Sequence, residues 1–121
     1  MSTTKTLGDL GETAVAAYLK RRGYALLERQ WRCRFGELDL VAQDRQGTIC
    51  FVEVKLRSSV THGLPREAVN ARKRRRLLTA ASCYLAARQI DSCCRFDVAE
   101  VYTDEHHSVT KIEYLEDAFE A

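Results

Sequence analysis

The chain contains little of what marks several common classes of protein. Its 121 residues include one proline and six glycines, spread along the chain, so no linker, repeat or low-complexity tract is visible. The longest apolar run, residues 14–19, is far shorter than the roughly 20 residues of a membrane helix, and the N-terminal stretch lacks the apolar centre of a secretory signal. We therefore expect one domain, residues 1–121, that stays in the cytoplasm and does not contact membranes.

Cysteine and histidine usage argues against two kinds of structural site. The five cysteines form neither an even set nor a C-x-x-C pair, which disfavours both a disulfide scaffold and a zinc ribbon. The adjacent residues His106 and His107 lie in a polar stretch between two apolar runs, where a solvated turn is a simpler explanation than metal ligation. We therefore expect the cysteines to be free thiols in a reducing compartment and the two histidines to lie in an exposed turn.

Charge is distributed unevenly although the net charge is only +2. Residues 1–96 carry 18 basic and 9 acidic side chains, a balance of +9, whereas residues 97–121 carry 1 and 8, a balance of −7. A basic body is the footprint expected for a polyanionic partner, although a charge run taken alone is more often a solvated face. The acidic tail suggests a separate hypothesis, a protein-interaction subunit.

Hydrophobic periodicity predicts an α/β fold of order αβββαββ. Helical spacing covers residues 7–22 and 65–89, the second helix beginning at Pro65. Period-two alternation and turn signals predict strands at residues 24–31, 37–43, 48–57, 96–102 and 109–115. The tail after the last strand is expected to form a short helix or to fray.

Residues 36–57, GELDLVAQDRQGTICFVEVKLR, place charge inside strands that are otherwise apolar. If Gly47 takes the left-handed position of a three-residue turn, the resulting register puts Asp39 directly opposite Glu53. Lys55 is two residues beyond Glu53 and therefore points to the same face. Burying such charges costs free energy unless a partner ion or a metal compensates, so the three residues need an explanation.

Two carboxylates beside a lysine have the composition of a magnesium site for phosphodiester hydrolysis. Hard oxygen ligands from Asp39 and Glu53 suit Mg²⁺, and the Lys55 ammonium can orient water and stabilise charge on phosphate oxygens. The simpler alternative is a cross-strand salt bridge, which would be favoured for an isolated E-x-K. The apolar context of both strands and the basic body favour the metal site.

Glu12 is a further candidate ligand from the first helix. It lies on the line of Val15 and Leu19 extended towards the N-terminus, so it should face the sheet, although a glutamate there is also explained by the helix dipole and solvent. Glu37 is predicted to be either an accessory acid or one half of a strand-end salt bridge.

The basic run at residues 72–76 supplies candidate phosphate contacts. Lys73 and Arg74 continue the apolar stripe of the second helix by one turn and should lean towards the sheet more than their basic neighbours can. Arg57 is a third candidate contact, and a solvated face is the alternative for the run. Trp31 and Tyr24 could stack on unpaired bases, with core packing favoured for at least one of them.

The stretches GELDLVAQD and FVEVKLR, preceded by GETAVAAYLKRRGY and followed by GLPREAV, resemble the YraN-like family of small bacterial proteins. That family is placed among the PD-(D/E)XK endonuclease-like folds and is similar to archaeal Holliday-junction resolvases. The resemblance covers nearly the whole chain up to about residue 102. Leu38 stands where the signature has proline, and His62 occupies a loop position where many relatives carry an aromatic residue.

The resemblance implies a restriction-endonuclease-like fold, a mixed central sheet flanked by helices, with Asp39, Glu53 and Lys55 matching the D…E-x-K signature. It also implies that Glu12 matches the helical glutamate that resolvases add to the metal shell. The resemblance implies an endonuclease that uses Mg²⁺ or Mn²⁺ on DNA, with branched or damaged structures as candidate substrates and a homodimer as a candidate assembly. The alternative is a non-catalytic nucleic-acid-binding module or a repair or recombination partner with the same fold.

Overall fold

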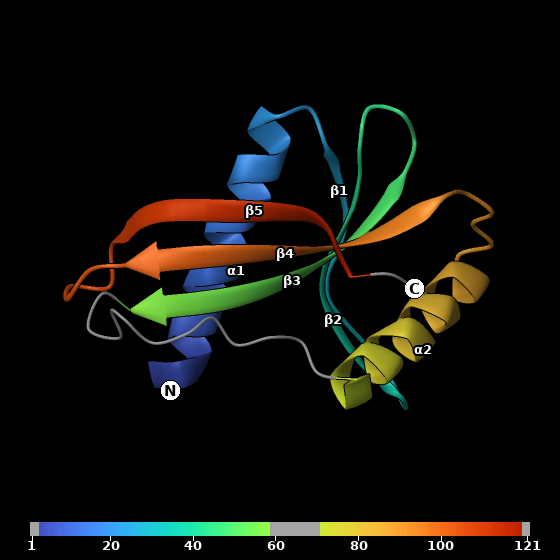
Figure 1. The fold of residues 1–121 in the computed structure, drawn as a ribbon, viewed down its shortest axis with the longest axis horizontal. Helices are drawn as coiled ribbons and strands as arrows, with labels where there is room; N and C mark the ends of the chain where they lie inside the picture. Colours follow the sequence, from blue (N-terminus) through green and yellow to red (C-terminus); the bar gives the residue numbers. More distant parts are fainter. Residues whose placement is uncertain (1–2, 59–70, 120–121) are drawn as a thin grey trace.

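The structure, a computed structural model, describes residues 3–58 and 71–119. Elements in these ranges follow the predicted order αβββαββ and have the bounds α1 Thr3–Arg21, β1 Ala25–Cys33, β2 Gly36–Gln43, β3 Ile49–Ser58, α2 Ala71–Ala87, β4 Cys94–Thr103 and β5 Val109–Phe119. The strands form one mixed sheet of order β1-β2-β3-β4-β5, in which only β3 and β4 run parallel. Figure 1 shows the β1–β2 hairpin crossing the direction of β3, β4 and β5, so the sheet is strongly twisted.

The two helices pack against opposite faces of the sheet, because the apolar side chains of the central strands alternate between two cores. In β3, Cys50 and Val52 join the core under α1, whereas Phe51 joins the core under α2. The predicted helix stripes are confirmed, since Val15 and Leu19 of α1 are buried in the first core. The α2 stripe contributes Leu77, Ala81 and Tyr84 to the second core.

The turn between β2 and β3 has the predicted register. Gly47 has a φ of 90°, the Asp44 N–H donates to the Thr48 carbonyl oxygen at 3.0 Å, and the Asp44 side chain accepts hydrogen bonds from two backbone N–H groups of the turn. The ladder then runs as far as the pair Leu40 and Val52. A left-handed residue at the end of the turn is favourable only for glycine, so Gly47 sets the alignment of the two strands.

The expected tail needs correction, and two other predicted positions lie outside the described residues. The tail is neither helical nor frayed as far as residue 119, because β5 continues past the predicted end at residue 115 and pairs with β4. A bulge between Phe96 and Val98 and the positive φ of Asp117 allow this continuation. Pro65, the predicted helix start, and His62 lie outside the described residues.

Three minor expectations can be compared directly with the structure. All five cysteines are free thiols, and His106 and His107 lie in the turn between β4 and β5. The side chain of Asp104 organises that turn by accepting hydrogen bonds from two backbone N–H groups. Neither described helix is both long and apolar enough to cross a membrane.

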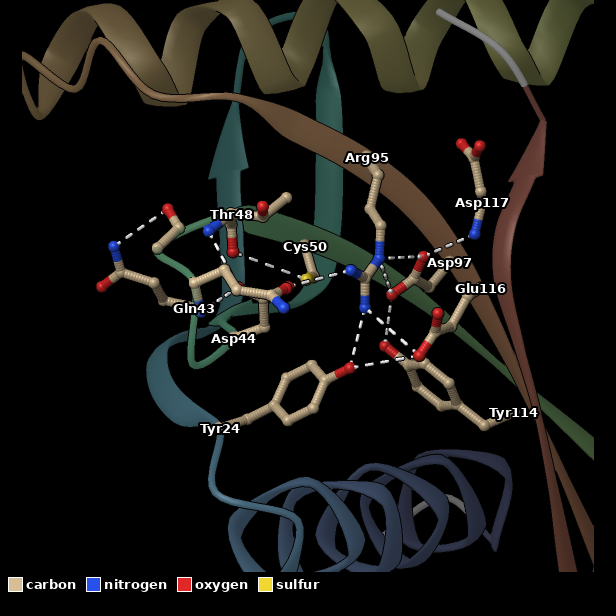
Figure 2. Close-up of polar contacts among 12 residues, drawn as sticks. Tyr24, Gln43, Asp44, Thr48, Cys50, Arg95, Asp97, Tyr114, Glu116 and Asp117 are labelled. Atoms are coloured by element: carbon tan, nitrogen blue, oxygen red, sulfur yellow. Dashed lines mark hydrogen bonds and ion pairs between the residues drawn. The ribbon is translucent and has the colours of Figure 1, made fainter.

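Arg95 joins four segments of the chain at the start of β4. Its guanidinium donates to both carboxylate oxygens of Asp97 at 3.1 and 3.2 Å, to Asp44 Oδ2 at 3.0 Å and to the Tyr24 hydroxyl at 2.7 Å, as Figure 2 shows. Asp44 belongs to the β2–β3 turn and Tyr24 precedes β1. Arg95 therefore connects the segment before β1 and the β2–β3 turn to β4.

Asp97 is the buried centre of the same network and is fully inaccessible to solvent. Besides Arg95, it accepts hydrogen bonds from the Tyr114 hydroxyl at 2.6 Å and from the Asp117 N–H at 2.8 Å (Figure 2). Glu116 contributes an outer ion pair to Arg95 at 3.6 Å. The end of β5 is therefore anchored to β4 through the Tyr114 hydroxyl and the Asp117 backbone N–H, whereas the Glu116 side chain stays largely exposed.

We predict that Arg95→Ala destabilises the protein by about 3–5 kcal/mol, because it leaves the buried Asp97 carboxylate without its countercharge. The free energy of unfolding would be measured by urea denaturation at pH 7. Arg88→Ala is the control, since Arg88 forms a more exposed ion pair with Glu28 and should cost about 1 kcal/mol or less. Equal losses for the two variants would contradict a central role of the network.

Candidate active site between two strands and a helix

Asp39 lies where β2 and β3 separate. The next pair in register after Leu40 and Val52 would be Asp39 and Glu53, but the backbone ladder stops before it. Instead the Asp39 Oδ2 atom accepts the Val54 N–H at 2.9 Å, so a side chain replaces the missing backbone acceptor. We call the resulting gap the β2–β3 opening; it sets the Asp39 and Glu53 side chains next to each other, as the register predicted.

A cavity of about 550 Å³ lies beside the opening. Its walls come from the β1–β2 hairpin, from β2 and β3, and from the first turns of α2. The lining residues are Arg32, Cys33, Gly36, Glu37, Asp39, Glu53, Val54, Lys73, Arg76 and Leu77. The φ of 154° at Gly36 favours glycine, and a Cβ atom there would make an ordinary contact with the Arg76 carbonyl oxygen at 3.7 Å, so the hairpin lies against α2 at this point.

Two of the three carboxyl groups that line the cavity, Asp39 and Glu53, are held in an unfavourable charge state. Burial, and after it the negative charge of Asp39, raises the pKa of Glu53 to about 7. Burial also raises the pKa of Asp39, although the hydrogen bond from the Val54 N–H opposes the rise. Both groups are ready to accept a proton or a cation, because the protein around them does not fully compensate two negative charges.

Two lysines approach this pair from different elements. The Lys73 Nζ atom of α2 lies 3.5 Å from Glu53 Oε1 and its side chain is 44% exposed. Lys55 of β3 shares the sheet face of Glu53, and its positive charge, like that of Lys73, lowers the Glu53 pKa. Lys55 does not line the cavity itself. The convergence of Asp39, Glu53 and Lys55 on one face is therefore observed.

Glu12 reaches the same region from α1. The helix lies close to β3 because Gly11 has no side chain; a Cβ atom there would be 3.3 Å from Val54. Glu12 is buried, its Oε1 atom has no hydrogen-bond partner, and Arg29 Nε lies 3.4 Å from that atom. Burial raises the Glu12 pKa, and the negative charge of Asp39 raises it further. Glu12 faces the sheet, as predicted, and is near enough to Asp39 to feel its charge.

The acidic residues do not form a complete cage for a metal. Within residues 3–58 and 71–119, no group of three or more His, Cys, Asp or Glu side chains is placed to hold an ion. The structure thus brings Asp39 and Glu53 together and leaves Glu12 at the edge of the pair. Such a donor set still fits Mg²⁺, which usually keeps several waters and takes only one or two protein carboxylates.

The candidate phosphate contacts are only partly where the sequence pattern put them. Lys73 leans towards the sheet as expected, but Arg74 is exposed and Arg76 lines the cavity in its place. Positions 73, 76 and 77 share one helix face, whereas residue 74 falls beside it. Arg57 lies outside the cavity and donates to the buried Glu100 at 3.2 Å.

The β1–β2 hairpin contributes cavity residues that the sequence pattern missed. β1 runs to Cys33, beyond its predicted end, so Arg32 and Cys33 reach the cavity. Arg32 Nε is 3.0 Å from Glu37 Oε2, which makes Glu37 one half of a strand-end ion pair at the cavity wall. The only sequence signal for this extension was the short spacing between the strands, which leaves room for a tight hairpin turn.

The two aromatic residues considered for stacking on bases have structural roles. Trp31 packs edge-on against Tyr84 of the α2 core with ring centroids 5.3 Å apart. Tyr24 accepts a hydrogen bond from Arg95 and packs against Tyr114. Core packing thus accounts for both.

These features define a mixed α/β protein with a pair of adjacent carboxyl groups, Asp39 and the buried Glu53, at a cavity lined by acidic and basic residues. Residues 11–101 match the model of the Uncharacterised protein family UPF0102, and the chain belongs to this family. A UPF0102 protein of Moorella thermoacetica is 44% identical over 118 residues, covering 97% of this chain and 98% of that protein. A UPF0102 protein of Alkaliphilus metalliredigens is 45% identical over 118 residues, which cover 96% of this chain and 99% of that protein. A UPF0102 protein of Trichlorobacter lovleyi is 44% identical over 117 residues, which cover 96% of this chain and 91% of that protein.

We predict that Glu53→Gln stabilises the metal-free protein at pH 8 but has less effect at pH 5. The folded-state pKa of Glu53 is raised above its ordinary value of 4.5 to about 7, so the folded protein binds more protons than the unfolded chain in that window. Stability is therefore lost as pH rises through the window, and the amide removes the loss. The gain at pH 8 should be about 3 kcal/mol, because the pKa rise from 4.5 to about 7 is worth about 1.4 kcal/mol per pKa unit.

Urea denaturation at the two pH values measures this difference. Glu105→Gln is the control, because Glu105 lies on the exposed β4–β5 turn with its side chain 78% exposed and should show no such pH dependence. A Glu53→Gln variant that is less stable than the wild type at pH 8 would show that the carboxylate is fully compensated in the fold.

Proposed function

We propose that this protein is a Mg²⁺- or Mn²⁺-dependent nuclease that hydrolyses phosphodiester bonds in DNA. One observation carries the proposal: Asp39 and the buried Glu53, two carboxyl groups with raised pKa values, share a cavity with Lys73, Arg76 and Arg32. A cation between the carboxylates would remove their mutual repulsion, and the three basic side chains would attract a phosphodiester. Neither feature is needed for stability, because the uncompensated pair lowers it.

The sequence signature supports the same proposal. Asp39, Glu53 and Lys55 resemble the D…E-x-K pattern of the PD-(D/E)XK nucleases, and the mixed sheet with β3 and β4 parallel is compatible with that superfamily. Glu12 resembles the additional helical glutamate of resolvases. Its buried oxygen without a hydrogen-bond partner is a suitable acceptor for a water held beside the metal, so Glu12 is proposed as an outer ligand.

Asp39 and Glu53 would hold the cation through their carboxylate oxygens. When bound, the ion supplies positive charge to the phosphate and lowers the pKa of a water. Asp39 is oriented by the Val54 N–H, so one of its oxygens keeps a fixed direction. Glu53 would exchange its contact with Lys73 for the cation, and the Lys73 ammonium would then contact a phosphate oxygen.

Lys55 is the proposed catalytic cation. It follows Glu53 by two residues and lies on the same face of β3. An ammonium group there orients the water and stabilises the negative charge that develops on the phosphate oxygens. Arg76 and Lys73 would position the chain without reading its sequence.

A non-catalytic nucleic-acid-binding module is the second candidate. The observation in its favour is the Lys73–Glu53 ion pair, because an ammonium already occupies part of the space that a cation would need. The DNA-binding surface would then be the basic wall of the cavity alone. Repulsion between two carboxylates and phosphate gives a pure binder no advantage, which favours the nuclease.

We predict that wild-type protein cleaves at least one of a panel of junction, flap, single-stranded and duplex DNA substrates in Mg²⁺ or Mn²⁺, and that Glu53→Gln abolishes cleavage. The amide keeps the shape of the side chain but removes the ligand charge, so folding and DNA binding should persist. Ca²⁺ should support little hydrolysis, because its looser coordination positions water and phosphate poorly.

Metal binding can be tested without any activity. Mg²⁺ should raise the thermal midpoint of wild-type protein and leave that of Glu53→Gln nearly unchanged, because only the wild type binds the ion in its folded state. Wild type that binds DNA but is neither stabilised by the ions nor able to cleave would favour the binding module instead.

We predict that Lys73→Ala weakens duplex DNA binding and flattens its salt dependence by about 0.9 in the log–log slope, as expected for one lost phosphate contact. Binding would be measured by fluorescence anisotropy over a range of KCl concentrations in Ca²⁺. Arg74→Ala is the matched control, since Arg74 is the adjacent basic residue but does not line the cavity. Identical slopes for the two variants would assign Lys73 to a solvated charged face.

A further inference from the structure

The turn between β1 and β2 exposes an aromatic side chain at the edge of the cavity. Arg34 and Phe35 form this turn, between the paired residues Cys33 and Gly36, both of which line the cavity. Phe35 is 46% exposed, although a side chain of this size is normally buried where a core offers space. Figure 1 shows the turn beside the first turns of α2.

Arg34 extends the exposed aromatic surface. Its guanidinium carbon lies 5.3 Å from the centre of the Phe35 ring, within the range of a cation–π contact. Arg32, on the same strand, has a side chain that is 75% exposed, and Arg76 lines the adjoining wall. An exposed aromatic ring with a guanidinium group beside it suits a ligand that offers both a π face and negative charge.

We propose that Phe35 stacks on an unpaired nucleobase of a single-stranded nucleic acid segment whose phosphate enters the cavity. This inference rests on the proposed function and names its substrate class. A cavity of about 550 Å³ has the size of a small-molecule pocket, so it accommodates a nucleotide but not a duplex. A base stacked at the rim therefore has to be unpaired, as at a single strand, a flap or an open junction.

Charge and area favour nucleic acid over a protein at this position. A protein interface would have to desolvate several arginines around one small apolar ring, whereas nucleic acid pairs them with phosphate. The other candidate aromatics, Trp31 and Tyr24, are held in internal contacts. Phe35 therefore offers an exposed aromatic ring in the turn between two residues that line the cavity.

The test measures binding in Ca²⁺, where little hydrolysis is expected, so that its outcome does not depend on cleavage. Labelled oligothymidylate, oligouridylate and a blunt duplex are titrated with wild type, Phe35→Ala and Phe35→Tyr and followed by fluorescence anisotropy. Leu115→Ala is the matched control, because Leu115 is a 37% exposed apolar residue on β5, at the opposite edge of the sheet.

Phe35→Ala should weaken single-strand binding on the order of tenfold or more, whereas Phe35→Tyr should restore it and duplex binding should change little. If Phe35→Ala loses affinity for oligothymidylate alone, DNA is the ligand. If it loses affinity for both oligothymidylate and oligouridylate, the base is the recognised group, whichever sugar carries it. Unchanged single-strand affinity in Phe35→Ala, an equal loss on the duplex, or an equal loss in Leu115→Ala would overturn the inference.

Failure of this inference is distinguishable from failure of the nuclease proposal. If Glu53→Gln abolishes cleavage while Phe35→Ala binds single strands normally, the nuclease stands and the stacking role is wrong. If no substrate is cleaved but Phe35→Ala still loses single-strand affinity selectively, the stacking site stands and the catalytic proposal is wrong.

Discussion

The hydrogen bond from the Val54 N–H to the Asp39 carboxylate is the contact on which the site depends. A backbone ladder that continued past Leu40 and Val52 would leave no opening between β2 and β3. Because a side chain satisfies the Val54 donor instead, the strands can separate without an unpaired buried N–H. The opening then places two carboxyl groups beside the cavity formed with α2 and the β1–β2 hairpin.

Stability and function make opposite demands on this region. Burial raises the pKa of both Asp39 and Glu53, which is a cost to the folded protein at neutral pH. A second charged network lies elsewhere in the fold, where Arg95 and Asp97 join the start of β4 to the end of β5 and to the β2–β3 turn. In that network Arg95 balances the buried Asp97 carboxylate, whereas at the cavity Lys73 and the Val54 N–H leave the pKa values of both carboxyl groups raised.

Much of this arrangement could be predicted from local sequence. Gly47 determines the register of β2 and β3, and the stripes that include Leu19 and Tyr84 determine which helix faces are buried. The same helical periodicity predicted that the Glu12 side chain faces the sheet. These predictions were correct because turn geometry and helical spacing act over a few residues and do not depend on the rest of the fold.

The remaining features depend on contacts between distant segments and could not be predicted. The extension of β5 to Phe119 requires a bulge opposite Phe96 and an anchor at Asp97. The exchange of Arg74 for Arg76 at the cavity depends on how α2 is rotated against β2. Phe35 reads as an ordinary turn residue until the hairpin is placed beside α2.

The central claim, that Asp39 and Glu53 form a divalent-cation site, is tested most directly by a crystal structure of the protein grown with Mn²⁺. Anomalous scattering at a wavelength where manganese contributes strongly locates the ion without reference to activity. The account predicts one anomalous peak in contact with oxygens of both carboxylates, with Lys73 moved away from Glu53. A structure at saturating Mn²⁺ with no peak at the pair, and with Lys73 still bound to Glu53, would contradict it.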